Sequence, residues 1–216
     1  MRDFAIIGLG NFGATVARSL SELGIRVTAI DANKDRVQKI QDELHTCIVA
    51  DATVREVLEQ LGVPHFECFV VSTGENTHAS IMITLYLSEM KAKRIVVKAR
   101  SQDHATILQK VGATDTIIPE QQMAERLSYS LAQSDIIDYL PLTEDYSITE
   151  VSAPAKLVGK SLRDLDLRNR YQIQMIAAKP SGEGRFDFAP GGDYVIDKGD
   201  ILIVLGKTED VNKLRG

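Results

Sequence analysis

Three glycines near the start of the chain have the types and spacing that can bind a phosphate group. The stretch "FAIIGLGNFG" places Gly8, Gly10 and Gly13 directly after four apolar residues. In such a loop the first glycine makes a tight turn, the second lets the backbone approach a phosphate, and the third lets helix and strand pack closely. The N-terminus of the helix that follows favours an anion. The motif therefore predicts a nucleotide site and leaves open whether the nucleotide serves catalysis or sensing.

A carboxylate follows this loop at the position where a ribose is held in such sites. Asp31 ends the apolar run "RVTAID". Its side chain can accept hydrogen bonds from both ribose hydroxyls and would repel a 2′-phosphate, which argues against NADP. NAD, ATP, ADP and AMP all remain open as ligands.

Further polar residues follow the later apolar runs, which we expect to be strands of one sheet. Ligands of open α/β sheets bind at the carboxyl ends of the strands. Lys98 or Arg100 could contact a phosphate there, and Glu120 could hold a divalent cation against it. A surface ion pair or a helix cap explains each residue equally well when it is taken singly. The candidates, in chain order, are Asp51, Ala52, Thr53, Thr73, Gly74, Glu75, Lys98, Arg100 and Glu120.

Catalytic chemistry has little support in the sequence. The histidines are His45, His65, His78 and His104, and none belongs to a recognisable pair of base and nucleophile. A dehydrogenase usually needs a positioned proton carrier from a substantial second domain. His78, in "TGENTHASI", lies nearest the predicted site, where a helix-surface position also explains it. We therefore predict a nucleotide sensor and not an enzyme. The first alternative is a small NAD-dependent oxidoreductase. The second is a nucleotide sensor that acts on some other transporter or exchanger.

The elements that must position these residues follow an alternating pattern up to about residue 133. Short β-branched runs alternate with longer segments of helical spacing, which is typical of a parallel sheet covered on both faces. Gly24, Gly62 and Gly112 fall where helices should end. The pattern predicts a doubly wound, Rossmann-like α/β domain. The expected strands are "FAIIG", "RVTAID", "CIVAD", "CFVVST", "RIVVKA" and "TDTIIP".

The pattern changes after Pro119. Met123, Leu127 and Leu131 recur at helical spacing. This helix either packs on its own sheet or crosses to dock between subunits. Beyond Pro141 the apolar runs are short and broken by Gly and Pro, which indicates a small α+β module. We expect a nucleotide-binding domain at 1–133 that includes the helix, a linker at 134–142, and the α+β module at 143–216.

The composition narrows the class of protein. The chain has 216 residues, is 44% hydrophobic and carries a net charge of −5. It has no long basic run, so we expect no nucleic-acid partner. No apolar stretch approaches the length of a membrane span, and the apolar start lacks the basic region of a signal peptide. Cys47 and Cys68 lack the spacing of a disulfide framework or zinc site, so we expect reduced core residues.

The order of motifs along the chain resembles the RCK family (regulators of potassium conductance). The stretches that carry the resemblance are "FAIIGLGNFGATVARSLSELGIRVTAID", "VADAT", "VVSTGENTHASIMITLYLSEM", "IVVKARS" and "LQKVGATDTIIPEQQMAERLS". The most similar branch is the cytosolic regulatory subunit of Ktr/Trk-type potassium uptake systems. The resemblance implies a homodimer that assembles into an octameric ring beneath a membrane-embedded potassium translocating subunit. It also implies a cytoplasmic protein, peripheral at the cell membrane, whose cleft binds ATP and ADP, or NAD(H).

The resemblance also implies roles for individual residues. Relatives often have arginine where this chain has Asn11. An asparagine offers no charge to a terminal phosphate, so we expect no strong discrimination of ATP from ADP. The matching positions are Gly8, Gly10, Asn11, Phe12 and Gly13 for the phosphates, Asp31 and Asn33 for the ribose, Asp51, Ala52 and Thr53 for the adenine, Lys98 near the phosphates, and Glu120 for a cation at the dimer interface.

A second ligand is implied for the C-terminal module, because some relatives bind cyclic di-AMP there at a dimer interface. Gln174 stands where asparagine often occurs in those relatives. The alternative is that this segment only forms core and dimer contacts. The positions that match the cyclic di-AMP site are Leu165, Asp166, Arg168, Tyr171, Gln174 and Pro190.

Overall fold

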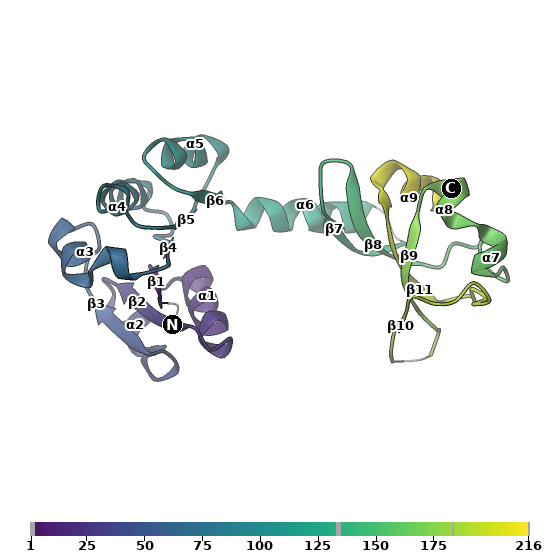
Figure 1. Cartoon of the computed structure of the whole chain (residues 1–216), viewed down its shortest axis with the longest axis horizontal. Helices are drawn as coiled ribbons and strands as arrows, with labels where there is room; N and C mark the ends of the chain where they lie inside the picture. Colours follow the sequence, from purple (N-terminus) through teal and green to yellow (C-terminus); the bar gives the residue numbers. More distant parts are fainter. Residues whose placement is uncertain (1–2, 133–134, 183, 216) are drawn as a thin grey trace. The chain divides into compact units, whose positions relative to one another are not determined.

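The chain folds into two compact units. The computed structural model describes residues 3–132, 135–182 and 184–215. The contacts between residues divide the chain after Pro119, and Figure 1 colours the two units from purple to teal and from teal to yellow. Among the described residues, no helix combines the length and the apolar character that crossing a bilayer requires.

The N-terminal unit is built on one parallel sheet of six strands in the order β3-β2-β1-β4-β5-β6. This is the doubly wound order that the alternating pattern predicts, and it confirms the Rossmann-like fold. The strand order reverses between β1 and β4, which lie side by side. The strands are β1 (Asp3–Ile7), β2 (Arg26–Asp31), β3 (Thr46–Val49), β4 (Cys68–Val71), β5 (Ile95–Lys98) and β6 (Asp115–Ile117).

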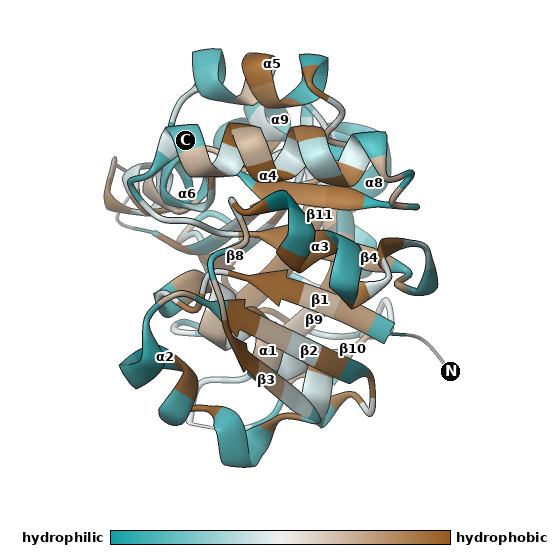
Figure 2. Ribbon diagram, turned by 90° about the vertical axis from the view of Figure 1, so that its left-hand side faces the viewer, coloured by the Kyte–Doolittle hydropathy of each residue, from teal (hydrophilic) through white to brown (hydrophobic). Residues whose placement is uncertain are grey.

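Helices cover both faces of this sheet (Figure 1). Successive strand residues point to opposite faces, so Ile7 belongs to the core beneath α3, α4 and α5, whereas Ile6 belongs to the core beneath α1 and α2. In Figure 2 most of β1 is hydrophobic and much of α2 is hydrophilic, as this layering requires. The helices are α1 (Asn11–Glu22), α2 (Lys34–Gln38), α3 (Arg55–Leu61), α4 (Thr77–Glu89) and α5 (Gln102–Lys110), with single 3₁₀ turns at Gln41–Glu43 and Val63–His65.

The cysteines and the predicted helix ends behave as the sequence indicates. Cys68 is buried and Cys47 is half-buried, and both are free thiols. Burial raises the pKa of each thiol. Gly62 ends α3 in the left-handed conformation, with φ of 73°, which glycine adopts without a steric penalty.

The C-terminal unit is an antiparallel sheet in the order β10-β9-β11-β8-β7, with small helices against it. Alternate residues of β11, such as Leu202 and Val204, enter a core that also holds Leu157, Ile173 and Ile196. The α+β module that the sequence predicts is therefore present. Its elements are β7 (Ile136–Pro141), β8 (Tyr146–Ser152), α7 (Leu162–Leu165), α8 (Leu167–Tyr171), β9 (Gln174–Lys179), β10 (Asp187–Phe188), β11 (Ile201–Lys207) and α9 (Thr208–Arg215).

Helix α6 (Pro119–Ala132) groups with the C-terminal unit. Arg126 Nε donates to Asp138 Oδ1 of β7 at 2.7 Å, and the ring centres of Tyr129 and Tyr139 lie 4.1 Å apart. These contacts attach the helix to the antiparallel sheet.

The segment expected as a linker at 134–142 also differs from that expectation. Residues Ile136–Pro141 form β7, which pairs with β8. The segment forms a strand because its apolar side chains are needed in the core of the C-terminal unit: Ile136 is buried in that core and Tyr139 packs against it. The domain boundary placed between residues 133 and 134 lies outside the described residues.

Candidate nucleotide site

A cleft of about 350 Å³ opens where the carboxyl ends of β1, β2, β3 and β4 meet. This is the point at which the strand order reverses, where open α/β sheets bind their ligands. The structure brings together six residues that the sequence places at a nucleotide site: Gly8, Asp31, Asp51, Ala52, Thr53 and Thr73.

The three glycines of the loop meet different surroundings. A Cβ on Gly8 would lie 2.1 Å from the carbonyl oxygen of Ser72, and one on Gly13 would lie 1.9 Å from the carbonyl oxygen of Gly8. A Cβ on Gly10 would have no atom within 4 Å. Gly8 and Gly13 are therefore required for the packing of β1, β4 and α1, whereas Gly10 leaves room for a ligand to approach the backbone.

The first turn of α1 is suited to a phosphate. Gly10 is the N-cap, and within the described part of the chain no side chain caps the helix and no acidic residue lies in its first turn. The N–H groups at the start of a helix lack partners within the helix and carry its positive dipole. Asn11, Phe12 and Gly13 supply these groups. The turn therefore fits an anion.

Asp31 is held rigidly beside this turn. The Leu9 N–H donates to Asp31 Oδ2 at 2.6 Å and the Asn33 N–H donates to Oδ1 at 2.8 Å. The Asp31 residue is only 8% exposed, and Arg36 Nη1 lies 3.4 Å from Oδ2. A carboxylate has about four acceptor positions, and Leu9 and Arg36 use the two on Oδ2. Oδ1 therefore retains capacity for a ribose hydroxyl, and Oδ2 would gain it if Arg36 turned towards the phosphates.

Asn33 has a local structural role. Its Oδ1 accepts hydrogen bonds from the N–H groups of Asp35 and Arg36, at 2.9 and 3.3 Å, and so caps α2. It does not line the cleft. Its contribution to the site is through its own N–H, which positions Asp31.

The segment after β3 forms the wall next to Asp31, and the Ala50 N–H donates to the Asp31 carbonyl oxygen at 3.1 Å. Asp51 Oδ1 accepts hydrogen bonds from the Thr53 hydroxyl at 2.7 Å and from the Thr53 N–H at 2.9 Å. These bonds hold the pKa of the Asp51 carboxyl below its ordinary value. Ala52 is buried between them. The wall therefore joins a charged edge to an apolar surface, as contact with an adenosine group requires.

The segment after β4 forms the third wall. The Thr73 hydroxyl donates to the carbonyl oxygen of Asn76 at 3.0 Å, and Asn76 Oδ1 accepts from the Ala79 N–H and caps α4. Gly74 adopts φ of 63° in this turn but does not line the cleft. His78 does line it, on the first turn of α4.

The cationic candidates lie outside this cleft. Lys98 Nζ lies 5.7 Å from the ring centre of Phe12, next to the glycine loop. Arg100 forms an ion pair with Glu75, which is the alternative role that the sequence left open for it. Neither Lys98 nor Arg100 lines the cleft.

Glu120 belongs to the C-terminal unit, on the first turn of α6, and is exposed. Within residues 3–132, 135–182 and 184–215 there is no group of three or more His, Cys, Asp or Glu side chains that could hold a metal ion.

A second hollow of about 570 Å³ adjoins the glycine loop and contains cations that the sequence reasoning missed. Gly10 and Asn11 line it together with Arg18, Arg36 and Lys39. Arg36 lines both this hollow and the cleft. The signal that could have found Arg36 is its place in the first turn after Asp31, in "DANKDR".

The six residues expected at a second ligand divide between two hollows of the C-terminal unit. Four of them, Asp166, Arg168, Gln174 and Pro190, line a hollow of about 490 Å³. Leu165 and Tyr171 line a separate hollow of about 350 Å³.

Known families match the two parts of the chain in succession: the TrkA-N domain matches residues 4–119, and the TrkA-C domain matches residues 148–216. Ktr system potassium uptake protein C of Bacillus subtilis (strain 168) is 37% identical over 212 residues, which are 98% of this chain and 95% of that protein. Ktr system potassium uptake protein A of Vibrio alginolyticus is 33% identical over 215 residues, which are 99% of this chain and 97% of that protein.

Solved structures share the fold at low sequence identity. The GsuK channel bound to NAD has a TM-score of 0.54 and 20% identity, over 99% of this chain and 38% of that chain. The TrkA-N domain of the inner membrane protein ybaL from Escherichia coli has a TM-score of 0.55 and 15% identity, over 61% of this chain and 97% of that chain. Domain order, relatives and fold agree, and the chain belongs to the RCK family of Ktr- and Trk-type potassium uptake proteins.

Proposed function

We propose that this protein is a nucleotide-sensing regulatory subunit, which controls a membrane-embedded potassium translocating subunit of Ktr/Trk type without converting the nucleotide. The observation that carries the proposal is the cleft at the reversal of strand order, where Asp31 lies next to the uncapped first turn of α1. The relatives that match almost the whole chain are proteins of the Ktr potassium uptake system.

The proposed nucleotide is ATP or ADP, or alternatively NAD(H). The adenosine half would lie in the cleft, with its ribose on Asp31 and its adenine against Asp51, Ala52 and Thr53. The phosphates would follow the turn from Gly8 through Gly10, Asn11 and Phe12 to Gly13, towards Lys98. Thr73, Gly74, Asn33 and Arg100 would shape the surrounding loops. GsuK structures of similar fold are described as bound to NAD and to ADP.

Sensing requires that two nucleotides bind two conformations of the protein with different affinity. A polyphosphate brings several negative charges to the glycine loop, and the loss of one phosphate changes the charge there. The Asn11 side chain is uncharged, so the cations beside the loop are Arg18, Arg36 and Lys39 of the adjoining hollow and Lys98 next to Phe12. They are the groups through which the number of phosphates would be detected.

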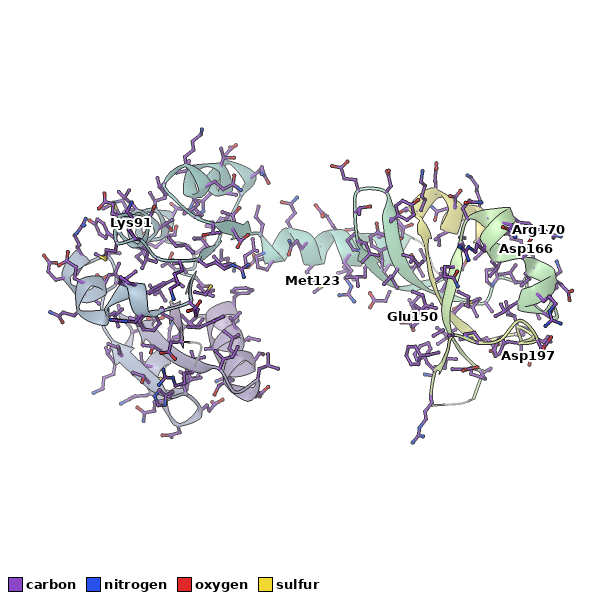
Figure 3. All side chains as sticks on the ribbon, viewed as in Figure 1. Lys91, Met123, Glu150, Asp166, Arg170 and Asp197 are labelled. Atoms are coloured by element: carbon purple, nitrogen blue, oxygen red, sulfur yellow. The ribbon has the colours of Figure 1, made fainter. Side chains whose placement is uncertain are left out.

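The proposed assembly is a homodimer that forms an octameric ring. The ring would lie at the cytoplasmic side of the membrane and bind there through the membrane partner. We propose α6 as the subunit interface. Met123, Leu127 and Leu131 are 59%, 55% and 76% exposed, and Figure 3 marks Met123 on this helix. Three large apolar side chains at a spacing of four residues form one stripe of a helix. Such a stripe fits another protein surface better than it fits water.

Two further ligands belong to the proposal. A divalent cation would lie between the exposed Glu120 side chains of two protomers. Cyclic di-AMP would bind the hollow lined by Asp166, Arg168, Gln174 and Pro190, at a contact between two C-terminal modules. Leu165 and Tyr171, which the resemblance also assigns to this ligand, line a separate hollow.

The test is to measure mass in solution and thermal stability with ATP, ADP, NAD, NADH and cyclic di-AMP. A ligand that binds only the folded state stabilises it in proportion to its affinity. We expect ring-sized assemblies, stabilisation by at least one adenine nucleotide, and no oxidation of NADH with small carbonyl compounds. This stabilisation by the adenine nucleotide must be lost in the Asp31→Ala variant. Turnover of NADH, or melting curves that no nucleotide shifts, would overturn the proposal.

A further inference from the structure

The hollow that Leu165 and Tyr171 line is separate from the one proposed for cyclic di-AMP. It measures about 350 Å³, and no residue lines both hollows. It lies between the turn that precedes α7 and the single turn of α8. Its lining residues are Lys156, Leu157, Lys160, Asp164, Leu165, Arg170 and Tyr171.

The rim of this hollow carries an excess of positive charge. Within the described residues, the side chains of Lys160 and Arg170 make no ion pair. Lys156 Nζ donates to the carbonyl oxygen of Lys213 at 2.7 Å, which leaves two of its three protons for other acceptors. The single carboxylate, Asp164, accepts a hydrogen bond from the Ser161 hydroxyl at 2.7 Å.

The rest of the hollow complements these cations. The half-buried Tyr171 has a hydroxyl without a hydrogen-bond partner among the described residues, and Lys156 Nζ lies 5.8 Å from its ring centre. Leu157 and Leu165 are buried and form an apolar floor. Donors around the rim and an apolar floor suit an anion with a small apolar body.

The backbone fixes the direction of the two residues from α8. Asp166 and Gln172, at the two ends of α8, have φ of 44° and 57°, and the Arg170 N–H donates to the Asp166 carbonyl oxygen at 3.0 Å. In Figure 3 Asp166 and Arg170 lie together on this turn. A helix of one turn between two left-handed residues directs Arg170 and Asp166 to different hollows.

We propose that this hollow binds the phosphoryl group of a small phosphorylated molecule. A phosphate ester carries a charge of about −1.5 to −2 at neutral pH and three acceptor oxygens, which matches three cations opposed by one carboxylate. Arg170 supplies a planar fork of donors, and Lys156 and Lys160 supply point charges. Free phosphate and a phosphate ester share this chemistry, and the ester alone would also contact the floor.

The experiment titrates inorganic phosphate and AMP, in separate arms, into the full chain. Backbone amide chemical shifts of Lys160, Arg170 and Tyr171 report this hollow separately from the N-terminal cleft, and their titration curves give its affinity. We expect K160Q/R170Q to weaken binding at least tenfold. R185Q/K198Q is the matched control, because it removes the same two charges from exposed residues of the same unit that line neither hollow.

The outcomes separate the sources and test the site. Tighter binding of AMP than of phosphate would identify an organic phosphate ester as the ligand, and equal affinities would identify the phosphoryl group alone; both support the proposal. The proposal is overturned if K160Q/R170Q binds both probes as the parent does, or if R185Q/K198Q weakens binding equally. Because the amide shifts report this hollow and not the N-terminal cleft, either result leaves the proposed nucleotide sensing unaffected.

Discussion

The carbonyl oxygen of Gly8 occupies the space that a side chain at residue 13 would need: a Cβ on Gly13 would lie 1.9 Å from it. Helix α1 begins so close to the end of β1 that only a hydrogen fits between them. Gly10, between these two residues in the chain, has no atom within 4 Å of such a Cβ. The same loop thus contains glycines required for packing and one that is open to a ligand.

Exchanging these glycines for alanine should separate stability from binding. Gly13→Ala must displace backbone, which costs about 1–3 kcal/mol or more, and its melting temperature should fall. Gly10→Ala should cost about 1 kcal/mol at most, as a change of N-cap residue. It should nevertheless weaken nucleotide binding about tenfold or more, equivalent to about 1.4 kcal/mol. Thermal melts measure the loss of stability and calorimetry measures the loss of affinity. A Gly10→Ala protein that binds ATP, ADP and NAD normally would show that the phosphates do not lie at this turn.

Asp31→Asn should change which nucleotide is preferred. The amide retains an acceptor for the Leu9 N–H, which donates to the carboxylate at 2.6 Å in the parent, but it loses the charge that repels a 2′-phosphate. We expect the affinity for NAD to fall about tenfold and the ratio of NAD to NADP affinity to fall with it. Competition titrations with the two dinucleotides measure the ratio. An unchanged ratio would show that the ribose does not lie against Asp31.

His104 should make the stability of the N-terminal unit depend on pH. It is buried, its Nδ1 accepts from the Arg100 N–H at 3.3 Å, and its Nε2 lies 3.0 Å from Ser80 Oγ. The Ser80 hydroxyl donates to the Thr77 carbonyl oxygen, so Nε2 carries the proton and the ring is neutral. Burial, and then the charge of Arg100, lower the pKa of His104 from its ordinary value of 6.5.

The sign of the pH effect follows from linkage. Below pH 6.5 the unfolded chain binds a proton at His104 that the folded state resists, so the free energy of unfolding falls as the pH falls towards the folded pKa. Above pH 6.5 the contribution of His104 is constant. Urea unfolding between about pH 7.5 and 5.5 should give a steeper loss for the parent than for His104→Gln. His78→Gln, an exposed histidine, is the control and should retain the parental slope.

A charge within the apolar stripe of α6 should weaken self-association. Leu127→Glu would place a carboxylate in the proposed interface, where burial without a partner is costly. We expect the dimer dissociation constant to rise about tenfold or more, with an unchanged melting temperature at dilution, because Leu127 is 55% exposed in the single chain. Sedimentation velocity measures it. Leu23→Glu, at the more exposed leucine that caps the C-terminal end of α1 (76%), should leave the assembly intact. A parental mass for Leu127→Glu would show that the interface lies elsewhere.

The amino-acid sequence determined the features that depend on neighbours along the chain. The alternation of β-branched runs with helical segments sufficed for the parallel sheet, because both periodicities are local. The glycine loop and Asp31 were readable because a turn, a helix N-terminus and a strand end each have a short sequence signal. These signals put six residues into one cleft of the structure.

Only the tertiary structure decided the relationships between distant segments. It attached α6 to the antiparallel sheet through Arg126 and Asp138, and it added Arg36 and His78 to the cleft. It also sent Asp166, which is left-handed at the start of α8, and Arg170, within that helix, to different hollows. Neither a pairing between elements nor a direction set by a strained turn has a periodic signature, so both emerge only when the whole chain packs.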